Sequence, residues 1–247
     1  MLGIPDRMRA CLFDLDGVLM QTARVHAAAW KAMFDSFLTA WAERTGNPFV
    51  PFDVHADYNR FVDGKPRADG TASFLASRGI ALPPGRDDDP PDALTVHGLG
   101  NQKNKIVLTK IAEEGAEVFP GSLRYLMAVH AAGLACGVVS SSANCRPILA
   151  AAGIEPMMQV VVDGLVAAEQ GLAGKPAPDT YLAASRALRV PPSQAAVFED
   201  ALAGVSAGRA GGFGWVVGID RADQGDELRA HGADVVVSDL ADLIGRP

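Results

Sequence analysis

Carboxylate side chains follow two separate apolar stretches of this 247-residue chain, and their types and spacing indicate metal-assisted chemistry. Asp14 and Asp16 come directly after the first stretch, which ends at Phe13. Glu199 and Asp200 come directly after a later stretch of the same kind. If both stretches are parallel strands of one sheet, these carboxylates meet beyond the carboxyl ends of the strands, where such sheets bind ligands. Gathered carboxylates repel one another, and a hard divalent cation offsets that repulsion, so we predict a Mg²⁺ site there.

A serine and a lysine add groups that can bind a phosphoryl group. Ser140 follows another apolar stretch, and Lys175 lies in a Pro-rich loop that opens a predicted helix. An ammonium group, a hydroxyl group and a metal together can neutralise the oxygens of a transferring phosphoryl group. A carboxylate beside the phosphorus can attack it to form an aspartyl-phosphate, and a second carboxylate can act as general acid and base. The predicted catalytic residues are Asp14, Asp16, Ser140 and Lys175.

Short apolar runs and helical patterns alternate along most of the chain. Runs of about four to six apolar residues that stop at Gly and Asp are typical of buried parallel strands, and helical patterns lie between most of these runs. We therefore expect an α/β core, a doubly wound parallel sheet of the Rossmann-like kind. The predicted strands are 9–13, 135–139, 160–162, 195–198, 215–219 and 235–237. The predicted helices of this core are 120–130, 146–152, 179–188 and 201–210.

The segment 22–102 interrupts this alternation and contains no convincing buried strand. Thr22 is a candidate N-cap for a helix over 23–42, whose large apolar side chains recur at helical spacing. That stripe includes Trp30, and we interpret it as core packing in preference to a ligand site. We interpret 22–102 as a helical cap domain inserted after the first strand, with 1–21 and 103–247 forming the core domain.

The composition excludes several classes of protein. Hydrophobic residues make up 49% of the chain, which is enough to bury a core. The net charge of −7 argues against a nucleic-acid surface or an anionic-membrane patch. The start of the chain is unlike a signal peptide, and Cys11, Cys136 and Cys145 have no pairing or metal-binding spacing. We expect a soluble, cytoplasmic monomer with reduced thiols, acting on a small molecule, with no nucleic-acid or membrane partner.

Four motifs resemble those of the haloacid-dehalogenase-like (HAD-like) phosphohydrolase superfamily, both in their order along the chain and in their residues. They are Phe13-Asp-Leu-Asp-Gly-Val18, Val139-Ser140, Lys175 and Phe198-Glu-Asp200. The resemblance covers nearly the whole chain. It implies that the helical insertion is the mobile cap that this superfamily places between its first and second motifs.

The same resemblance implies a role for each residue of the core. Asp14 would be the nucleophile and Asp16 the general acid and base. Mg²⁺ would be held by the Asp14 carboxylate, the backbone carbonyl of Asp16 and Asp200, with Glu199 adjacent. The residues that would bind the phosphoryl group are Ser140 and Lys175.

Within that superfamily the sequence most resembles the β-phosphoglucomutase branch, in the core motifs and in Val62-Asp-Gly-Lys-Pro-Arg67 of the insertion. By this resemblance Arg67 grips the distal phosphate, Thr22 works at the hinge, and His26 aligns Asp16 on closure. Without the resemblance, we would interpret Arg67 as a charged side chain exposed to solvent and His26 as a histidine at the surface or packed against neighbouring residues. The predicted substrate-binding residues are Thr22, His26, Trp30, Gly64, Arg67, Ser141, Ser142 and Asn144.

Three positions depart from the pattern of that branch. Asp63 and Ala143 stand where the pattern has lysines, and Gln21 replaces a frequent aspartate. Lys65 or Arg146 could supply the lost charge from other positions. These departures leave phosphoryl transfer intact and affect only the choice of sugar phosphate.

The leading hypothesis is a mutase that converts β-glucose 1-phosphate to glucose 6-phosphate, with glucose 1,6-bisphosphate as primer. The alternative is a sugar-phosphate phosphatase, which would share every core residue. The complete catalytic set argues against a non-catalytic sensor of phosphorylated metabolites, and Asp16 would have no purpose in a halogen-displacing enzyme. A nucleotide-binding P-loop is excluded because proline, and not serine or threonine, follows Lys175.

Overall fold

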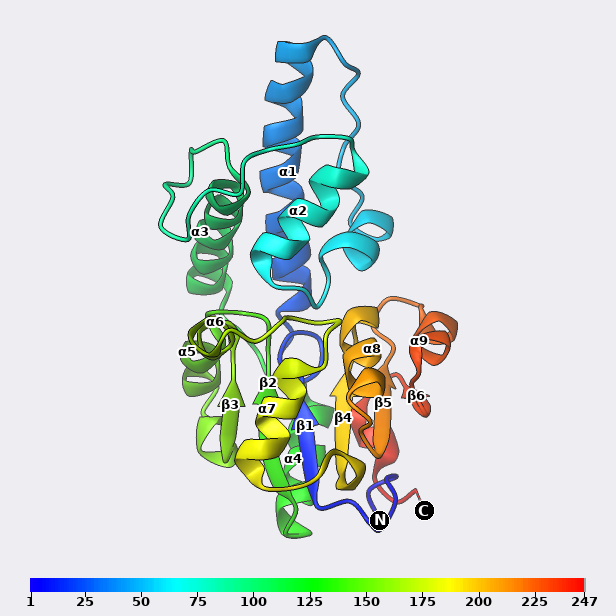
Figure 1. The fold of residues 1–247 in the computed structure, drawn as a ribbon. Coiled ribbons are helices and arrows are strands. Elements are labelled where there is room, and N and C mark those ends of the chain that lie inside the picture. Colours follow the sequence, from blue (N-terminus) through cyan, green and yellow to red (C-terminus); the bar gives the residue numbers. More distant parts are fainter. Residues whose placement is uncertain (247) are drawn as a thin grey trace. The chain divides into compact units, whose positions relative to one another are not determined.

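A computed structural model describes residues 1–246 of the chain (Figure 1). The chain divides into two compact units. Unit 1 contains Met1–Gln21, Gly64–Pro66 and the chain from Ala116 onward, and unit 2 contains Thr22–Asp63 and Arg67–Gly115. Each unit is described by itself below.

Unit 1 is built on a six-stranded sheet in the order β3-β2-β1-β4-β5-β6, and every neighbouring pair is parallel. The first strand lies in the middle, and the chain extends the sheet first to one side and then to the other. This order produces the doubly wound fold that the alternating pattern predicts. The strands are β1 (Ala10–Phe13), β2 (Ala135–Val139), β3 (Val160–Val162), β4 (Ala195–Glu199), β5 (Trp215–Ile219) and β6 (Val235–Val237).

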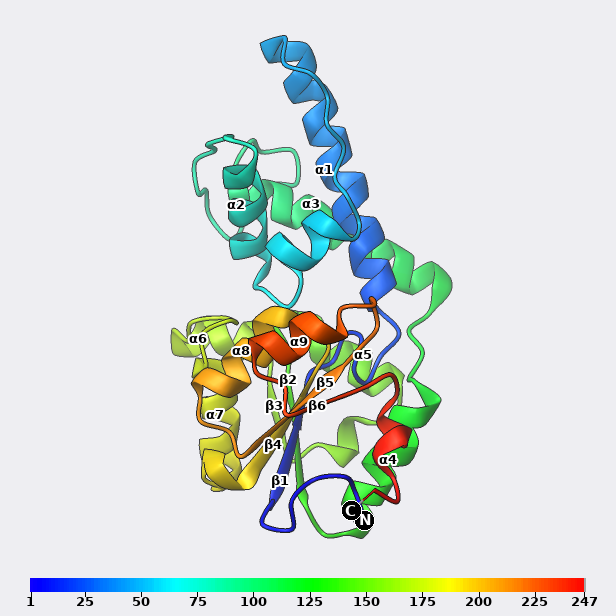
Figure 2. The ribbon, with the colours of Figure 1, turned by 90° about the vertical axis from the view of Figure 1, so that its right-hand side faces the viewer.

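Helices cover both faces of this sheet (Figure 2). The helices α7 (Asp179–Leu188) and α8 (Leu202–Ala210) lie on one face, and α4 (Pro120–Ala131) lies on the other. Alanine and glycine dominate α8, so its backbone can approach β4 and β5 closely. The remaining helical elements of unit 1 are α5 (Cys145–Ala151), η2 (Glu155–Met157), α6 (Gly164–Gln170), η3 (Pro192–Gln194), α9 (Gly225–His231) and η4 (Leu240–Leu243).

The strands of the sheet have continuous apolar sequences because both of their faces are buried. All four residues of β1 are buried, as are all five of β4. Phe13 stacks on Phe198 with ring centroids 4.6 Å apart, and Tyr125 of α4 packs against both rings. Tyr125 also donates its hydroxyl hydrogen to Leu2 O at 2.8 Å, which provides a partner for its polar end. The aromatic stack therefore anchors the strand ends from which the site begins.

Unit 2 is helical, as the sequence predicts. Its core forms around Phe34, whose ring lies 5.2 Å from Trp30, 5.2 Å from Phe52 and 4.1 Å from Phe74, centroid to centroid. The predicted apolar stripe thus packs as core. The elements of unit 2 are α1 (Ala23–Thr45), the π-helical turn η1 (Tyr58–Val62), α2 (Arg67–Ser77) and α3 (Val96–Glu114).

The chain leaves unit 1 for unit 2 and returns to it through neighbouring backbone. Met20 forms an antiparallel bridge with Val118, and Gln21 N donates to Glu117 O at 2.8 Å. Phe119 N donates to Leu19 O at 2.9 Å. The inserted segment is therefore closed at its base by backbone hydrogen bonds.

The structure differs from the sequence-based boundaries in three places. The predicted return at residue 103 falls inside α3, which continues to Glu114, so unit 2 ends at Gly115. Gly64–Pro66 groups with unit 1, although we assigned it to the insertion. Thr22 precedes α1 directly, but its side chain makes no capping hydrogen bond because its backbone is already helical (φ −93°, ψ −11°).

The three cysteines are free and buried, as expected from their apolar surroundings. Within residues 1–246, no helix combines the length and the apolar character needed to cross a bilayer.

We predict that Phe34→Ala destabilises the protein by about 3–5 kcal/mol, because the lost ring leaves a cavity among aromatic neighbours that cannot collapse. Urea unfolding followed by tryptophan fluorescence checks this, since Trp30 stacks on Phe34. The matched control is Phe49→Ala, whose ring is 46% exposed and should change stability by less than about 0.5 kcal/mol. Equal losses in the two variants would contradict the assignment of Phe34 to the core.

Candidate active site

The predicted site residues of the core meet at the carboxyl ends of β1, β2 and β4. The register pairs Phe13 with Val138 on one side and with Phe198 on the other, so the next residue of each strand comes to the same edge. Asp14 N donates to Phe198 O at 3.0 Å and thereby extends the pairing by one residue. Parallel pairing therefore holds the Asp14 backbone next to β4 and fixes the origin of its side chain.

Lys175 lies at the centre of this edge, in the loop before α7. Its Nζ donates to Asp14 Oδ1 at 2.5 Å, to Glu199 Oε1 at 2.5 Å and to Val139 O at 3.0 Å. The ammonium group thus uses its three hydrogens on the ends of three different strands. Its side chain is only 1% exposed, so these contacts replace water completely.

Glu199 accepts further hydrogen bonds from groups around it. The Tyr181 hydroxyl donates to Glu199 Oε1 at 2.7 Å, and Ala201 N donates to Oε2 at 3.3 Å. Tyr181 was not among the predicted site residues. The signal was a tyrosine on the buried face of an amphipathic helix, where its hydroxyl needs a polar partner.

The acidic side chains at this edge can hold a cation. Asp14, Glu199 and Asp200 each offer a carboxylate oxygen within 4.8 Å of the others, and this is the one such group in the described chain. Asp14 and Glu199 pair with one buried lysine, and the oxygen donors of the group suit a hard divalent ion such as Mg²⁺. The group does not include the Asp16 side chain, and the metal-binding role expected for the Asp16 carbonyl stays a prediction.

Burial governs the electrostatics of the site. Burial raises the pKa of Asp14 well above its usual value; Lys175 opposes that shift, while Glu199 and Asp16 add to it. Burial acts to lower the pKa of Lys175, but the carboxylates of Asp14 and Glu199 outweigh it and the pKa is raised. Lys175 is therefore protonated, while burial disfavours the charged form of Asp14.

Gly17 lets the first and fourth motifs approach each other. Its φ of 86° lies in the left-handed region, and a Cβ there would overlap the Asp200 carboxylate. Only glycine satisfies both conditions without strain. The Asp-x-Asp-Gly pattern thus has a steric reason in addition to its chemistry.

The loop after β2 carries the predicted phosphate-binding serines and is shaped by its own hydroxyl groups. Ser140 Oγ accepts from Ser142 N at 3.1 Å, and Ser142 Oγ accepts from Asn144 N at 3.1 Å. The Ser141 hydroxyl donates to Gly64 O at 2.7 Å, which joins two segments of unit 1. Ser140 is 2% exposed and directly follows Val139, whose carbonyl binds Lys175.

The other predicted substrate-binding residues, Thr22, His26, Trp30 and Arg67, lie in unit 2, and their relation to the site stays a prediction. Lys103, which the sequence analysis missed, lies with Nζ 2.9 Å from His26 Nδ1 and 4.8 Å from the centroid of the Trp30 ring. A lysine ammonium donates and does not accept, so with Lys103 as the donor the ring proton of His26 would lie on Nε2. Burial lowers the pKa of Arg67.

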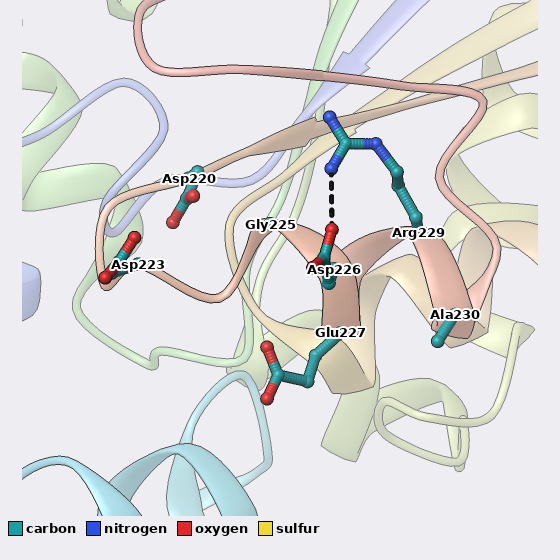
Figure 3. A pocket seen from close by; sticks show the side chains of 7 residues that line it. All are labelled: Asp220, Asp223, Gly225, Asp226, Glu227, Arg229 and Ala230. Carbon is teal, nitrogen blue, oxygen red and sulfur yellow. Dashed lines mark hydrogen bonds and ion pairs between the residues drawn. The ribbon is translucent and has the colours of Figure 1, made fainter.

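A shallow pocket on unit 1 lies outside the site (Figure 3). Asp220 and Asp223 of the β5–α9 loop and the first turns of α9 line it, and Arg229 there pairs with Asp226 at 3.2 Å. It contains none of the predicted site residues.

At the carboxyl edge of this parallel sheet, an aspartate pairs with a buried lysine beside an acidic group that can hold a cation. This arrangement is typical of α/β enzymes that transfer phosphoryl groups. The family model for haloacid dehalogenase-like hydrolases matches residues 8–212. The chain belongs to this family and is an enzyme of its type, which confirms the resemblance seen in the motifs.

Relatives extend the similarity over nearly the whole chain. A β-phosphoglucomutase of Mycobacterium bovis is 58% identical over 246 residues, covering 98% of this chain and 94% of that protein. A β-phosphoglucomutase of Bacillus subtilis is 32% identical, covering 96% and 92%. The crystal structure of a β-phosphoglucomutase from Clostridium difficile aligns with a TM-score of 0.73 at 23% identity, covering 96% and 93%. That last similarity supports the fold.

We predict that Lys175→Met lowers the folding stability by about 3–5 kcal/mol at pH 8 in the absence of metal. The change removes the ammonium group and leaves the buried carboxylates without a positively charged partner. The pKa of Asp14, already raised, would rise further. When the pKa of a carboxyl is higher in the folded state than in the unfolded state, the protein loses stability as the pH rises between those two values. The stability lost in Lys175→Met should therefore be smaller at pH 5 than at pH 8.

Urea unfolding in EDTA at pH 8 and pH 5 measures both effects. Lys105→Met, at an exposed position of α3, is the matched control and should shift stability by less than about 0.5 kcal/mol at either pH. A loss at Lys175 that is the same at both pH values would argue against uncompensated carboxylates as its cause.

Proposed function

We propose that this enzyme is a Mg²⁺-dependent β-phosphoglucomutase that converts β-glucose 1-phosphate to glucose 6-phosphate through an aspartyl-phosphate at Asp14. The observation that carries the chemistry is the buried contact between Lys175 and Asp14 within the acidic group at the sheet edge. The near full-length similarity to proteins named β-phosphoglucomutase supports the substrate.

Each core residue has a defined task in this proposal. An Asp14 carboxylate oxygen attacks the phosphorus of a sugar bisphosphate, and the bond from phosphorus to the sugar oxygen breaks as Asp16 gives that oxygen a proton. In the second half-reaction Asp16 removes the proton of a sugar hydroxyl, which attacks the aspartyl-phosphate and frees Asp14. Lys175 and Ser140 hold the phosphoryl oxygens while the bonds change.

The cation site fits this chemistry. Asp14, Asp200 and the Asp16 carbonyl would hold Mg²⁺, with Glu199 beside them. When bound, Mg²⁺ would supply positive charge to the phosphoryl oxygens and to the Asp14 carboxylate. The chain's own contribution is to gather these oxygens before the substrate arrives.

Unit 2 would act as the cap that binds the rest of the substrate. Arg67 would bind the distal phosphate, and the Nε2–H of His26, the tautomer that Lys103 selects, would orient Asp16 when the cap closes. Thr22 would serve the hinge, and Trp30 would brace His26 and Lys103. Excluding water at this step would direct the phosphoryl group to sugar and away from hydrolysis.

The remaining parts of the proposal concern the setting of the reaction. Glucose 1,6-bisphosphate would act as primer, and the protein would work as a cytoplasmic monomer on a small molecule.

The experiment that tests the function incubates the protein with Mg²⁺ and β-glucose 1-phosphate, with and without a trace of glucose 1,6-bisphosphate. Glucose 6-phosphate and free phosphate are measured together. We expect glucose 6-phosphate formation that depends on both the bisphosphate and Mg²⁺, with little free phosphate. Release of phosphate without isomerisation would instead establish a sugar-phosphate phosphatase.

We predict that Asp14→Asn lowers kcat by about a thousandfold or more, because the amide cannot attack phosphorus. Asp226→Asn, at a fully exposed position of α9, should leave kcat unchanged. Both variants should give the wild-type circular dichroism spectrum. Turnover by Asp14→Asn at the wild-type rate would rule out Asp14 as nucleophile.

A further inference from the structure

Side chains of the loop between β5 and α9 hydrogen-bond to the backbone of the loops that form the proposed cation site. Gln224, at the end of this loop, is 6% exposed. Its Nε2 donates to the backbone carbonyl of Asp200 at 2.9 Å. The side chain therefore holds the peptide of a residue whose carboxylate belongs to the acidic group.

Arg221, three residues earlier in the same loop, holds the other site loop. Its Nε donates to Gly17 O at 2.9 Å, and its Nη1 donates to Ser238 O at 2.8 Å. The guanidinium carbon lies 3.8 Å from the centroid of the Phe119 ring, which fixes the plane of the group. Arg221 thus joins the loop after β1 to the chain after β6.

The loop that carries these two side chains is itself held in place. Asp220 Oδ1 accepts from Gln224 N at 2.9 Å and from Ala222 N at 3.3 Å. Asp220 N donates to Val237 O at 2.8 Å, which extends the pairing of β5 with β6. The two donors are therefore presented from a braced loop at a fixed separation.

The two carbonyls that they hold belong to loops in close contact. A Cβ on Gly17 would overlap the Asp200 carboxylate, so the Gly17 backbone lies directly against that group. A shift of either loop would change the position of the Asp200 carboxylate relative to the Asp16 carbonyl. Arg221 holds the Gly17 carbonyl and Gln224 holds the Asp200 carbonyl, so each loop is tied to the same β5–α9 loop.

These side chains are poor choices for stability alone. Gln224 Oε1 and Arg221 Nη2 are buried, and neither has a hydrogen-bond partner within residues 1–246. A buried polar atom without a partner costs free energy, so apolar residues of similar size would serve packing better. The donors that these side chains direct to the Gly17 and Asp200 carbonyls favour a role in placing the site.

We propose that Arg221 and Gln224 are positioning residues that set the spacing of the two carboxylate loops and thereby the affinity for Mg²⁺. This inference rests on the proposed Mg²⁺ dependence of the enzyme. Partners that orient ligands in this way change metal affinity by about 10–100-fold in other proteins.

The test measures Mg²⁺ binding to the whole chain by titration calorimetry and, separately, urea unfolding without metal. Gln224→Met keeps the size of the side chain and removes its donor. We expect its Kd for Mg²⁺ to rise about tenfold or more. Its activity should return toward the wild-type kcat when Mg²⁺ is raised.

Arg221→Lys is the second variant, because it keeps the charge but cannot donate to Gly17 and Ser238 in the same fixed plane. We expect weaker Mg²⁺ binding here too, and this variant decides the matter if Gln224→Met does not fold. The matched control is Ser185→Ala. The Ser185 hydroxyl donates to Val190 O at 2.5 Å, at the opposite end of α7 from Lys175. Its loss should lower stability and leave the Kd unchanged.

The outcomes separate the two proposals. If the wild type binds Mg²⁺ and both variants bind it as tightly, the positioning role is wrong and the proposed function stands. If Ser185→Ala weakens Mg²⁺ binding as much as Gln224→Met, the effect is one of general stability and the role is also wrong. If the wild type binds no Mg²⁺, the proposed metal dependence fails and this inference fails with it.

Discussion

One buried ammonium group determines how this site is built. Lys175 donates to Asp14, to Glu199 and to the carbonyl of Val139, so it ties together the ends of β1, β2 and β4. A lysine buried to this degree is stable only where anionic partners surround it, and the carboxylates are stable only with the lysine present. The site and the sheet edge therefore depend on each other, and neither can be changed alone.

The acidic group at this edge also suits a cation. One lysine balances one carboxylate, and the acidic group contains three. Further acids at this edge would destabilise the empty protein unless a divalent ion shared them. A hard cation at the carboxyl ends of the strands, as we propose, would serve both the stability of this edge and the chemistry.

Much of this arrangement could be predicted from the sequence, because parallel strands bring residues that follow them to one edge. All six strands were placed within a residue or two, and Asp14, Lys175, Glu199 and Asp200 do converge. The whole of α3 was missed, and its first turns contain Gly98 and Gly100, which weaken helix propensity. Tyr181, Lys103, Arg221 and Gln224 also escaped, since their partners are distant carbonyls, carboxylates or rings that no local spacing reveals.

The closed base of the insertion has a consequence for how such enzymes diversify. Because Met20 pairs with Val118 and Gln21 with Glu117, the inserted segment begins and ends at paired backbone of unit 1. Loop-closure entropy grows slowly with the length of what lies beyond such a base. Natural selection can lengthen, trim or exchange the inserted module while the chemistry of the sheet edge stays untouched. Substrate range can then evolve at a rate of its own, independently of the reaction.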